Sequence, residues 1–206
     1  MTMKTVLSLG AVAVLAACAT TASAPSREET MQVIRSSFKE TGIAKLDRLN
    51  QSDLQQICSE AAMTGKDLPK DVRERLEKQQ MATIKYPADG KFLGDWKSGE
   101  RIAQTGVGLQ WTDSAKTVNG GNCYACHELT PQEISFGNIG PSLKGYGKLR
   151  GYSEPIVKYT WGKIWNTHAY NACSQMPRFG DPGILTEAQI KDVMALLLDP
   201  NSPVNK

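Results

Sequence analysis

Five consecutive residues carry the most distinctive chemistry in the sequence: Cys123-Tyr124-Ala125-Cys126-His127. This C-x-x-C-H spacing is the pattern by which a c-type haem is attached to a polypeptide. Two thiols three positions apart lie on adjacent parts of one turn, where they can add to the two vinyl groups of a single porphyrin. The histidine that follows then presents its imidazole to the iron from the same side. We therefore expect Cys123 and Cys126 to hold one covalent haem c, with His127 as an axial ligand.

Two other kinds of site also use paired cysteines. A thioredoxin-like C-x-x-C would follow a strand in a βαβ unit, and the sequence shows no alternating strand pattern of any length. A zinc site would need further ligands at suitable spacing. Beyond the motif and the N-terminal segment, only Cys58, Cys173 and His168 remain for that role. Haem attachment is therefore the favoured interpretation.

The opposite axial position of the iron also needs a ligand. Only two methionines follow the motif, Met176 and Met194. Met194 falls on the apolar face of a terminal helix, whereas Met176 lies in a segment with Pro and Gly, as a rigid loop would have. We predict Met176 as the second axial ligand, with His168, Cys173 or an open position as alternatives. A His–Met pair leaves no coordination site for substrate, which indicates an electron carrier.

The segment Asn138-Ile139-Gly140-Pro141-Ser142-Leu143 follows the motif by about a dozen residues. A carbonyl of Pro141 near His127 could accept its Nδ1–H, fixing the ring and raising its basicity. Gly140 would let the backbone approach the porphyrin edge. A simple turn explains the same letters equally well.

Two cysteines outside the motif, Cys58 and Cys173, are left to explain. In an oxidising compartment an unassigned pair suggests a disulfide, which would join the N-terminal part of the chain to the segment with Met176. Closing so long a loop would stabilise the fold by about 4–5 kcal/mol in the chain-entropy model. Two separate thiols, one facing a partner, are the alternative.

Residues 1–24 have the features of a secretory signal. Lys4 precedes the apolar run Val6–Ala17, and small residues lead to an A-x-A-like end at Ala24. The run is too short to span a bilayer. The letters L-A-A-C ending at Cys18 also resemble a bacterial lipobox, in which Cys18 becomes the lipidated first residue. Both routes predict export, to the periplasm, where disulfides form.

The remaining composition and patterning predict an all-α protein. Net charge is +3, with 24 basic and 21 acidic residues interspersed, so no nucleic-acid-binding face is indicated. Three amphipathic segments in residues 25–90 predict a helical extension, and a breaker cluster at 86–90 separates it from residues 91–206. Helices are predicted within 95–106, from Ser153 to Trp165 and after Thr186, while 133–151 is expected to be mostly irregular.

Short motifs predict where several of these helices begin and end. Capping boxes are predicted for three helices, and Ser153 is predicted to cap a fourth. The boxes are Ser26 with Glu29, Ser52 with Gln55, and Thr186 with Gln189. Gly42 and Gly65 are predicted to end the first two helices.

The order C-x-x-C-H, G-P-x-L, Met-Pro loop and terminal helix resembles a class I cytochrome c over residues 91–206. Within that group, the segments 121–127, 137–143 and 176–180 are similar to the SoxX family of sulfur-oxidation cytochromes. Carried over by position, the resemblance implies haem thioethers at Cys123 and Cys126.

It also implies a proximal ligand at His127 and a distal one at Met176. The family further implies a periplasmic heterodimer with a SoxA-type haem subunit. Such a pair is an L-cysteine S-thiosulfotransferase that couples thiosulfate oxidatively to a cysteine on a carrier-protein complex for sulfur intermediates. This subunit would receive the electrons and pass them to a downstream acceptor cytochrome, and it would not be catalytic alone. A general periplasmic electron carrier is the alternative. Residues 25–90 have no counterpart in short members, and we expect a partner-binding arm there.

Overall fold

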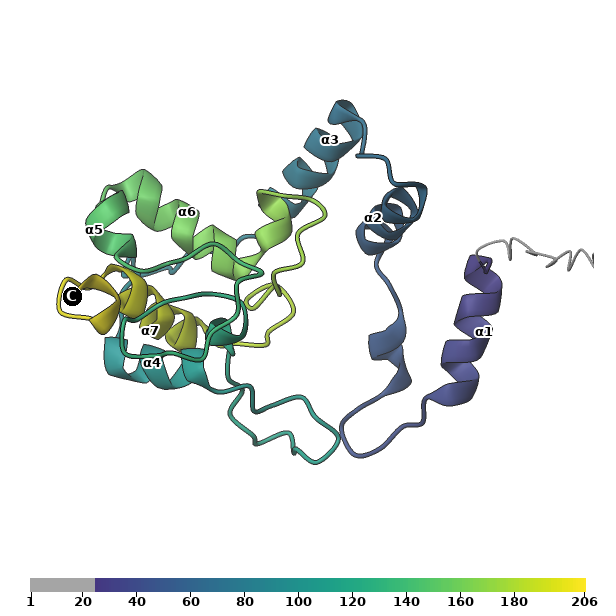
Figure 1. Cartoon of the computed structure of the whole chain (residues 1–206), viewed down its shortest axis with the longest axis horizontal. Helices are drawn as coiled ribbons and strands as arrows, with labels where there is room; N and C mark the ends of the chain where they lie inside the picture. The colour runs from purple at the N-terminus through teal and green to yellow at the C-terminus, as the bar shows by residue number, and fades with distance from the viewer. Residues whose placement is uncertain (1–24) are drawn as a thin grey trace, which may run out of the picture. The chain divides into compact units, whose positions relative to one another are not determined.

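The computed structural model describes residues 25–206, in which helices joined by loops are the main regular secondary structure (Figure 1). Within that range the only β-type pairing is an isolated bridge between Thr41 and Ala44. The α-helices are α1 (Arg27–Ser37), α2 (Asp53–Thr64), α3 (Lys70–Met81), α4 (Trp96–Gln104), α5 (Tyr146–Arg150), α6 (Glu154–Trp165) and α7 (Glu187–Leu198). Short 3₁₀ turns are η1 (Leu46–Leu49), η2 (Cys123–Ala125), η3 (Thr167–Ala169) and η4 (Pro203–Asn205). The predicted all-α class is confirmed.

Two compact units make up the chain, one ending at Phe38 and one spanning Lys39–Lys206. The described part of the first unit is α1, which buries none of its residues. The second unit holds α2 to α7. The predicted signal segment 1–24 and Cys18 lie outside the described residues.

Local sequence signals fix where several helices begin. All three predicted capping boxes are present, each with a hydroxyl accepting from a backbone N–H and a Glu or Gln side chain accepting in return. They are Ser26 with Glu29, Ser52 with Gln55, and Thr186 with Gln189. Helix α2 ends as predicted at Gly65, whose φ of 64° is the left-handed conformation that glycine adopts without strain.

The closest helix pair is α4 with α7, and small residues make it possible. Gly99 in α4 is buried against the backbone of Asp192, where a Cβ atom would overlap the carbonyl oxygen. Just before α4, the N–H of Gly94 donates to the Lys191 carbonyl at 2.9 Å, and that of Asp95 donates to the Asp192 carboxylate at 2.8 Å. The two chain ends of residues 91–206 are thereby fastened together.

A core forms around this pair from α4, α6 and α7. Trp161, Ile190, Met194, Leu196 and Leu198 are each buried to 0% exposure within it. The indole of Trp161 stacks on Trp165 with 5.9 Å between ring centroids. Met194 is therefore a core residue, as the apolar face of its helix predicts.

The N-terminal side of the second unit packs against residues 91–206. The indole N–H groups of Trp161 and Trp165 donate to the carbonyls of Lys85 and Thr83, at 2.8 and 3.1 Å. A second small cluster joins Leu54 of α2 and Leu76 of α3 to Ala172. Helices α2 and α3 thus pack with residues 91–206, although the breaker cluster at 86–90 is the strongest domain boundary that the sequence predicts.

Some local expectations differ from the structure. Residues 133–151 are irregular except for α5, whose five residues are too few to produce a helical pattern in the sequence. Helix α1 ends at Ser37 and not at Gly42. Ser153 precedes α6 without a side-chain capping bond. None of the described helices has the length and apolar character needed to cross a membrane.

Candidate haem site

The cysteine motif forms one tight turn. Cys123 begins η2, and its carbonyl accepts from the N–H groups of Cys126 and His127 at 3.1 and 3.0 Å. Asn122 precedes the turn with φ 47°, a left-handed conformation in which asparagine is enriched. Both cysteines are free thiols in the structure and partly buried, so the turn presents two thiols and an imidazole from one short segment.

His127 is held by the residues that the sequence singles out. Its Nδ1 lies 2.7 Å from the carbonyl oxygen of Pro141. Because a carbonyl can only accept, Nδ1 carries the hydrogen, and the lone pair of the neutral ring is on Nε2. The predicted Pro141 contact is therefore present and leaves Nε2 as the nitrogen for a metal.

Gly140 lies against the same imidazole. A Cβ atom on Gly140 would overlap ring atoms of His127, and the N–H of Gly140 donates to the Cys126 carbonyl at 2.8 Å. The sequence predicted that Gly140 would approach the porphyrin edge. In the structure its close neighbour is the His127 ring. Without a side chain at position 140, the Pro141 carbonyl can reach Nδ1.

The Cys123 thiol is not activated as a nucleophile. Burial raises the pKa of Cys123 to about 12. A reactive thioredoxin-like cysteine has a pKa below that of a free thiol. Among the described residues, no group of three or more His, Cys, Asp and Glu side chains is placed to hold a metal ion.

A polar network supports the turn from behind. The Tyr124 hydroxyl donates to the Glu100 Oε1 at 2.9 Å and lies 3.0 Å from the Thr130 hydroxyl. The other Glu100 oxygen is buried without a hydrogen-bond partner. Burial is the main cause that raises the pKa of Glu100, and nearby Glu133 adds to it. Glu100 lies 24 residues from Tyr124, so no sequence pattern could have identified this contact.

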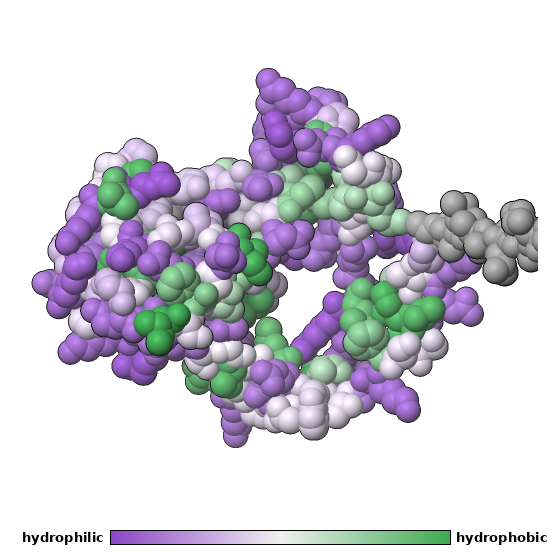
Figure 2. Space-filling view, in the orientation of Figure 1, coloured by the Kyte–Doolittle hydropathy of each residue, from purple (hydrophilic) through white to green (hydrophobic). Residues whose placement is uncertain are grey.

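Met176 lies in segment 171–185, here called the Met176 loop, which connects η3 to α7. Its side chain packs against the main core and lines a cavity of about 630 Å³. The cavity lies between the Met176 loop and the α2 region, and Figure 2 shows an opening between these parts of the molecule. His127 is not among the residues around this cavity, but Cys123 of its turn packs against the same core as Met176.

Ser174 organises the Met176 loop. Its hydroxyl accepts from the backbone N–H of Met176 at 3.2 Å and from the Thr167 hydroxyl at 3.0 Å. Its carbonyl accepts from Nε2 of His168 at 3.2 Å. Sequence reasoning missed Ser174, because a serine near a loop carries no distinctive signal.

His168 has a structural place in this arrangement. Burial is the first cause that lowers its pKa, so the neutral ring is favoured, and Nε2 must carry the hydrogen it donates to Ser174. Its side chain also lines the cavity beside Met176. The bond to Ser174 occupies the Nε2 of this alternative ligand, whereas the Met176 side chain packs against the apolar core.

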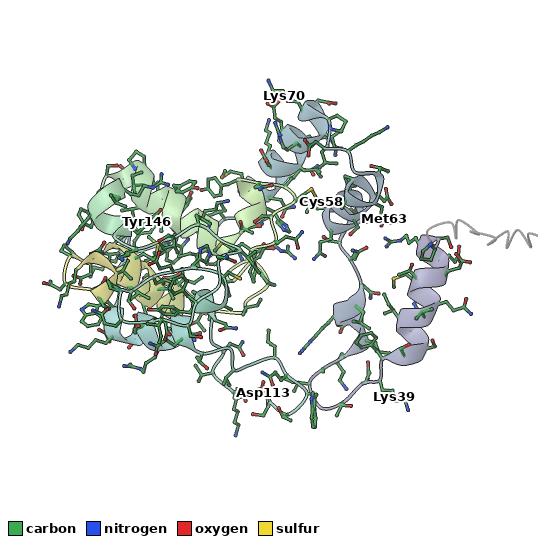
Figure 3. All side chains as sticks on the ribbon, in the orientation of Figure 1. Lys39, Cys58, Met63, Lys70, Asp113 and Tyr146 are labelled. Carbon is green, nitrogen blue, oxygen red and sulfur yellow. A yellow bond between two sulfur atoms is a disulfide. The ribbon has the colours of Figure 1, made fainter. Side chains whose placement is uncertain are left out.

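Cys58 and Cys173 form a disulfide across 115 positions of sequence (Figure 3). Cys58 lies on α2 and Cys173 in the Met176 loop, three residues before Met176. With this bridge, all four cysteines of the described residues have a place: two in the bridge and two in the turn.

Comparison with known proteins identifies the family. Residues 112–199 match the Cytochrome c family. The chain is also 41% identical, over 160 residues, to an uncharacterized lipoprotein of Aquifex aeolicus (strain VF5), with 76% of this chain and 73% of that protein covered. The chain belongs to one family with this lipoprotein, and its residues 112–199 form a cytochrome c domain. The matched region contains the cysteine turn, Pro141, Met176 and the whole of α7, while α2 to α4 lie before it.

The residues of this cytochrome fit a covalently bound haem c. Two free thiols lie on one turn, the Nε2 of His127 has its lone pair available, and a loop methionine faces a large cavity. Haem c supplies an iron that accepts and releases one electron, so a protein with this domain is an electron-transfer haem protein.

The surrounding residues hold the electron-transfer group still. Cys123 and Cys126 would fix it to the turn, while Pro141 sets the tautomer and orientation of His127. Buried Tyr124 and Glu100 anchor the turn to α4. A rigid set of ligands needs little rearrangement when the charge on the iron changes.

Proposed function

We propose that this cytochrome is the monohaem electron-transfer subunit of a periplasmic thiosulfate-oxidising complex of the SoxAX type. Its haem is held by Cys123 and Cys126, and its iron is bound by His127 and Met176. The bond from His127 Nδ1 to the Pro141 carbonyl carries the haem assignment, because it prepares Nε2 as a metal ligand. The similarity of segments 121–127, 137–143 and 176–180 to SoxX supports the choice of pathway.

In this role the cytochrome works with partners. A SoxA-type haem subunit forms the heterodimer and contains the reactive haem, at which thiosulfate is coupled to a carrier-protein cysteine. That coupling releases two electrons, which this subunit takes up one at a time and passes to an acceptor cytochrome. The subunit has no substrate site of its own when both axial positions are filled.

The cytochrome is exported and acts outside the cytoplasmic membrane. The N-terminal segment 1–24 has the features of a secretory signal, and the Aquifex relative is described as a lipoprotein. The L-A-A-C letters that end at Cys18 and the lipoprotein relative support lipid attachment at Cys18, and ordinary cleavage near Ala24 is the alternative. Mass spectrometry of the mature N-terminus distinguishes a diacylated Cys18 from an N-terminus near Pro25.

The ligand set is tested by changing Met176 to Ala. We expect the oxidised wild-type protein to show the weak far-red band of sulfur bound to ferric iron and the variant to lack it. The reduced variant should bind carbon monoxide at neutral pH, because its sixth position is open. Met63→Ala is the matched control, since Met63 is 68% exposed on α2. A far-red band that survives Met176→Ala would refute the proposed ligand.

The partner is tested separately. The tagged cytochrome is recovered from cells of the source organism grown with and without thiosulfate. Capture of a haem subunit of the SoxA type under thiosulfate growth is the expected result. Capture of an oxidase or of another dehydrogenase, with no SoxA-type subunit, would instead establish a general periplasmic electron carrier, which uses the same haem residues.

A further inference from the structure

The Cys58–Cys173 bridge joins the Met176 loop to α2, a helix that lies outside the region matched to cytochrome c. Cys173 is three residues before Met176, and Cys58 belongs to α2. We propose that this disulfide is a positioning device for Met176, which holds the thioether at the iron against competing ligands. The inference rests on the proposed role of Met176 as the axial ligand.

The first support is the way the Met176 loop is fastened. Ser174 fixes its start through three hydrogen bonds, and the loop is next tied to the core where the N–H of Phe179 donates to the Ile164 carbonyl at 3.1 Å. Residues 175–178 span these two points, and Gln175 and Pro177 are exposed. The position of Met176 therefore depends on how firmly the residues before it are held.

The second support is that the bridge leads to a fixed body. Ala172, beside Cys173, is buried to 0% exposure against Leu54 of α2 and Leu76 of α3. Its N–H donates to the carboxylate of Glu77 in α3 at 3.2 Å. The disulfide adds a covalent link to α2 at this point, so that α2, α3 and the start of the loop move together.

The third support is the cavity itself. It has a volume of about 630 Å³ and is lined by α2 on one side and by Met176 and its neighbours on the other. The small apolar cluster on this side of the molecule has three buried members, with four partly buried side chains packed against them. So small a cluster would hold α2 weakly without the bridge, because burial of a few side chains supplies little free energy. Opening the bridge would free one wall of the cavity, and with it the loop.

The test uses the full-length, haem-loaded protein with Cys58→Ala and Cys173→Ala combined. We expect cyanide to bind its ferric iron about tenfold faster or more, because Met176 leaves the iron more often. The far-red band should also disappear about one pH unit lower on alkaline titration. Leu54→Ala is the matched control, since it weakens the same cluster and keeps the bridge. We expect Leu54→Ala to change the cyanide rate much less than loss of the bridge does.

A second measurement applies if the double variant does not accumulate with haem. A water-soluble phosphine opens the bridge of the wild-type protein: the disulfide gains two electrons and two protons, and the phosphine becomes its oxide with oxygen from water. The thiols are then alkylated, and carbon monoxide binding is compared between bridged and opened ferrous protein. Binding that is about tenfold faster in the opened protein is the expected result.

The possible outcomes separate the two proposals. Equal ligand-binding rates with the bridge closed and absent, together with loss of the far-red band in Met176→Ala, would overturn only the positioning role of the disulfide. Retention of the band in Met176→Ala would overturn the ligand assignment first. If Leu54→Ala binds cyanide as fast as the double variant does, the effect arises from α2 packing, and the positioning role of the bridge is overturned.

Discussion

At the scale of single residues, the imidazole of His127 depends on a neighbour without a side chain. A Cβ at position 140 would overlap the ring, so Gly140→Ala must push His127 or the Pro141 carbonyl away. We expect the variant to lose about 1–3 kcal/mol of stability, as overpacked sites do, and to retain less haem. The haem-to-protein ratio and thermal unfolding measure both effects.

The control for this change lies next to it. Ile139 is 81% exposed, and Ile139→Ala should leave haem content and stability close to those of the wild type. Equal haem content in Gly140→Ala and the wild type would show that the ring can move without cost.

Glu100 predicts a pH dependence of stability. Its carboxyl pKa is raised above the ordinary value of about 4.5, chiefly by burial, so the folded chain holds this proton more tightly than the unfolded chain. The resulting stability is complete below pH 4.5 and is lost as the pH rises through the raised value. We expect Glu100→Gln to gain stability relative to the wild type as the pH increases from 4 to 8.

Melting temperatures of the two proteins across this pH range measure the effect. Glu60→Gln, an exposed carboxylate on α2, is the control and should give a curve parallel to that of the wild type. A constant difference between Glu100→Gln and the wild type at every pH would contradict the prediction.

Sequence and structure agree at residues whose roles are local. The turn from Cys123 to His127 follows from short-range spacing. Its contact with Pro141 was one of two equal interpretations of the spacing, the other being a simple turn, and the structure contains the contact. Glu100 and Ser174 could not be predicted, because their roles arise only when distant segments pack. The placement of Gly140 against the imidazole is a three-dimensional detail that spacing leaves open.

At the scale of elements, a single buried amide connects α5 with α7. Asn205 is 1% exposed, and its Oδ1 accepts from the N–H groups of Gly147 and Lys148 at 2.8 and 3.2 Å. Its Nδ2 donates to the carbonyls of Leu197 and Asp199, both at 3.0 Å. One side chain thus satisfies the open end groups of two helices.

We expect Asn205→Ala to destabilise the protein by about 2–4 kcal/mol, because it leaves buried backbone groups without partners. Denaturant unfolding of the haem-loaded protein measures this loss. Asn201→Ala is the control, since Asn201 is exposed four residues away. A loss as small as that of the control would mean that water replaces the amide.

Helices that begin at a capping box could be predicted from the sequence. Helices that depend on hydrogen bonds to distant residues could not. Helices α1, α2 and α7 begin at capping boxes readable in the sequence. Helix α5 is short and depends on Asn205, which lies 55 positions beyond its last residue Arg150. Helix α5 therefore forms only when the chain folds and brings Asn205 to its first turn.

At the scale of the whole molecule, the structure leaves fewer residues for the predicted partner-binding arm than the range 25–90. Helices α2 and α3 are built into the second unit by a disulfide and by the Trp161 and Trp165 hydrogen bonds. Helix α1 belongs to the other unit, buries nothing, and leaves Val33 63% exposed. We therefore propose segment 25–38 as the part of the predicted arm that contacts a partner.

Deletion of residues 25–38 tests this assignment. We expect the melting temperature of the haem-loaded protein to stay within about 2 °C of the wild-type value, because α1 adds no buried core. Affinity for the SoxA-type subunit should fall. Unchanged affinity would exclude α1 as the arm, and a large drop in melting temperature would show that it supports the fold.

The bridge between Cys58 and Cys173 also bears on how the protein is made. Both haem-binding thiols lie inside the covalent ring that it closes, and four thiols in one compartment can pair in three ways. In the one pairing that contains the Cys58–Cys173 bridge, Cys123 and Cys126 are joined to each other, and this bond must be reduced before both thiols can add to the porphyrin vinyl groups. The other two pairings must first be rearranged. We therefore expect a host that lacks a disulfide isomerase and a thiol reductant in the compartment where the chain folds to yield mostly colourless protein, as the haem-to-protein ratio would show.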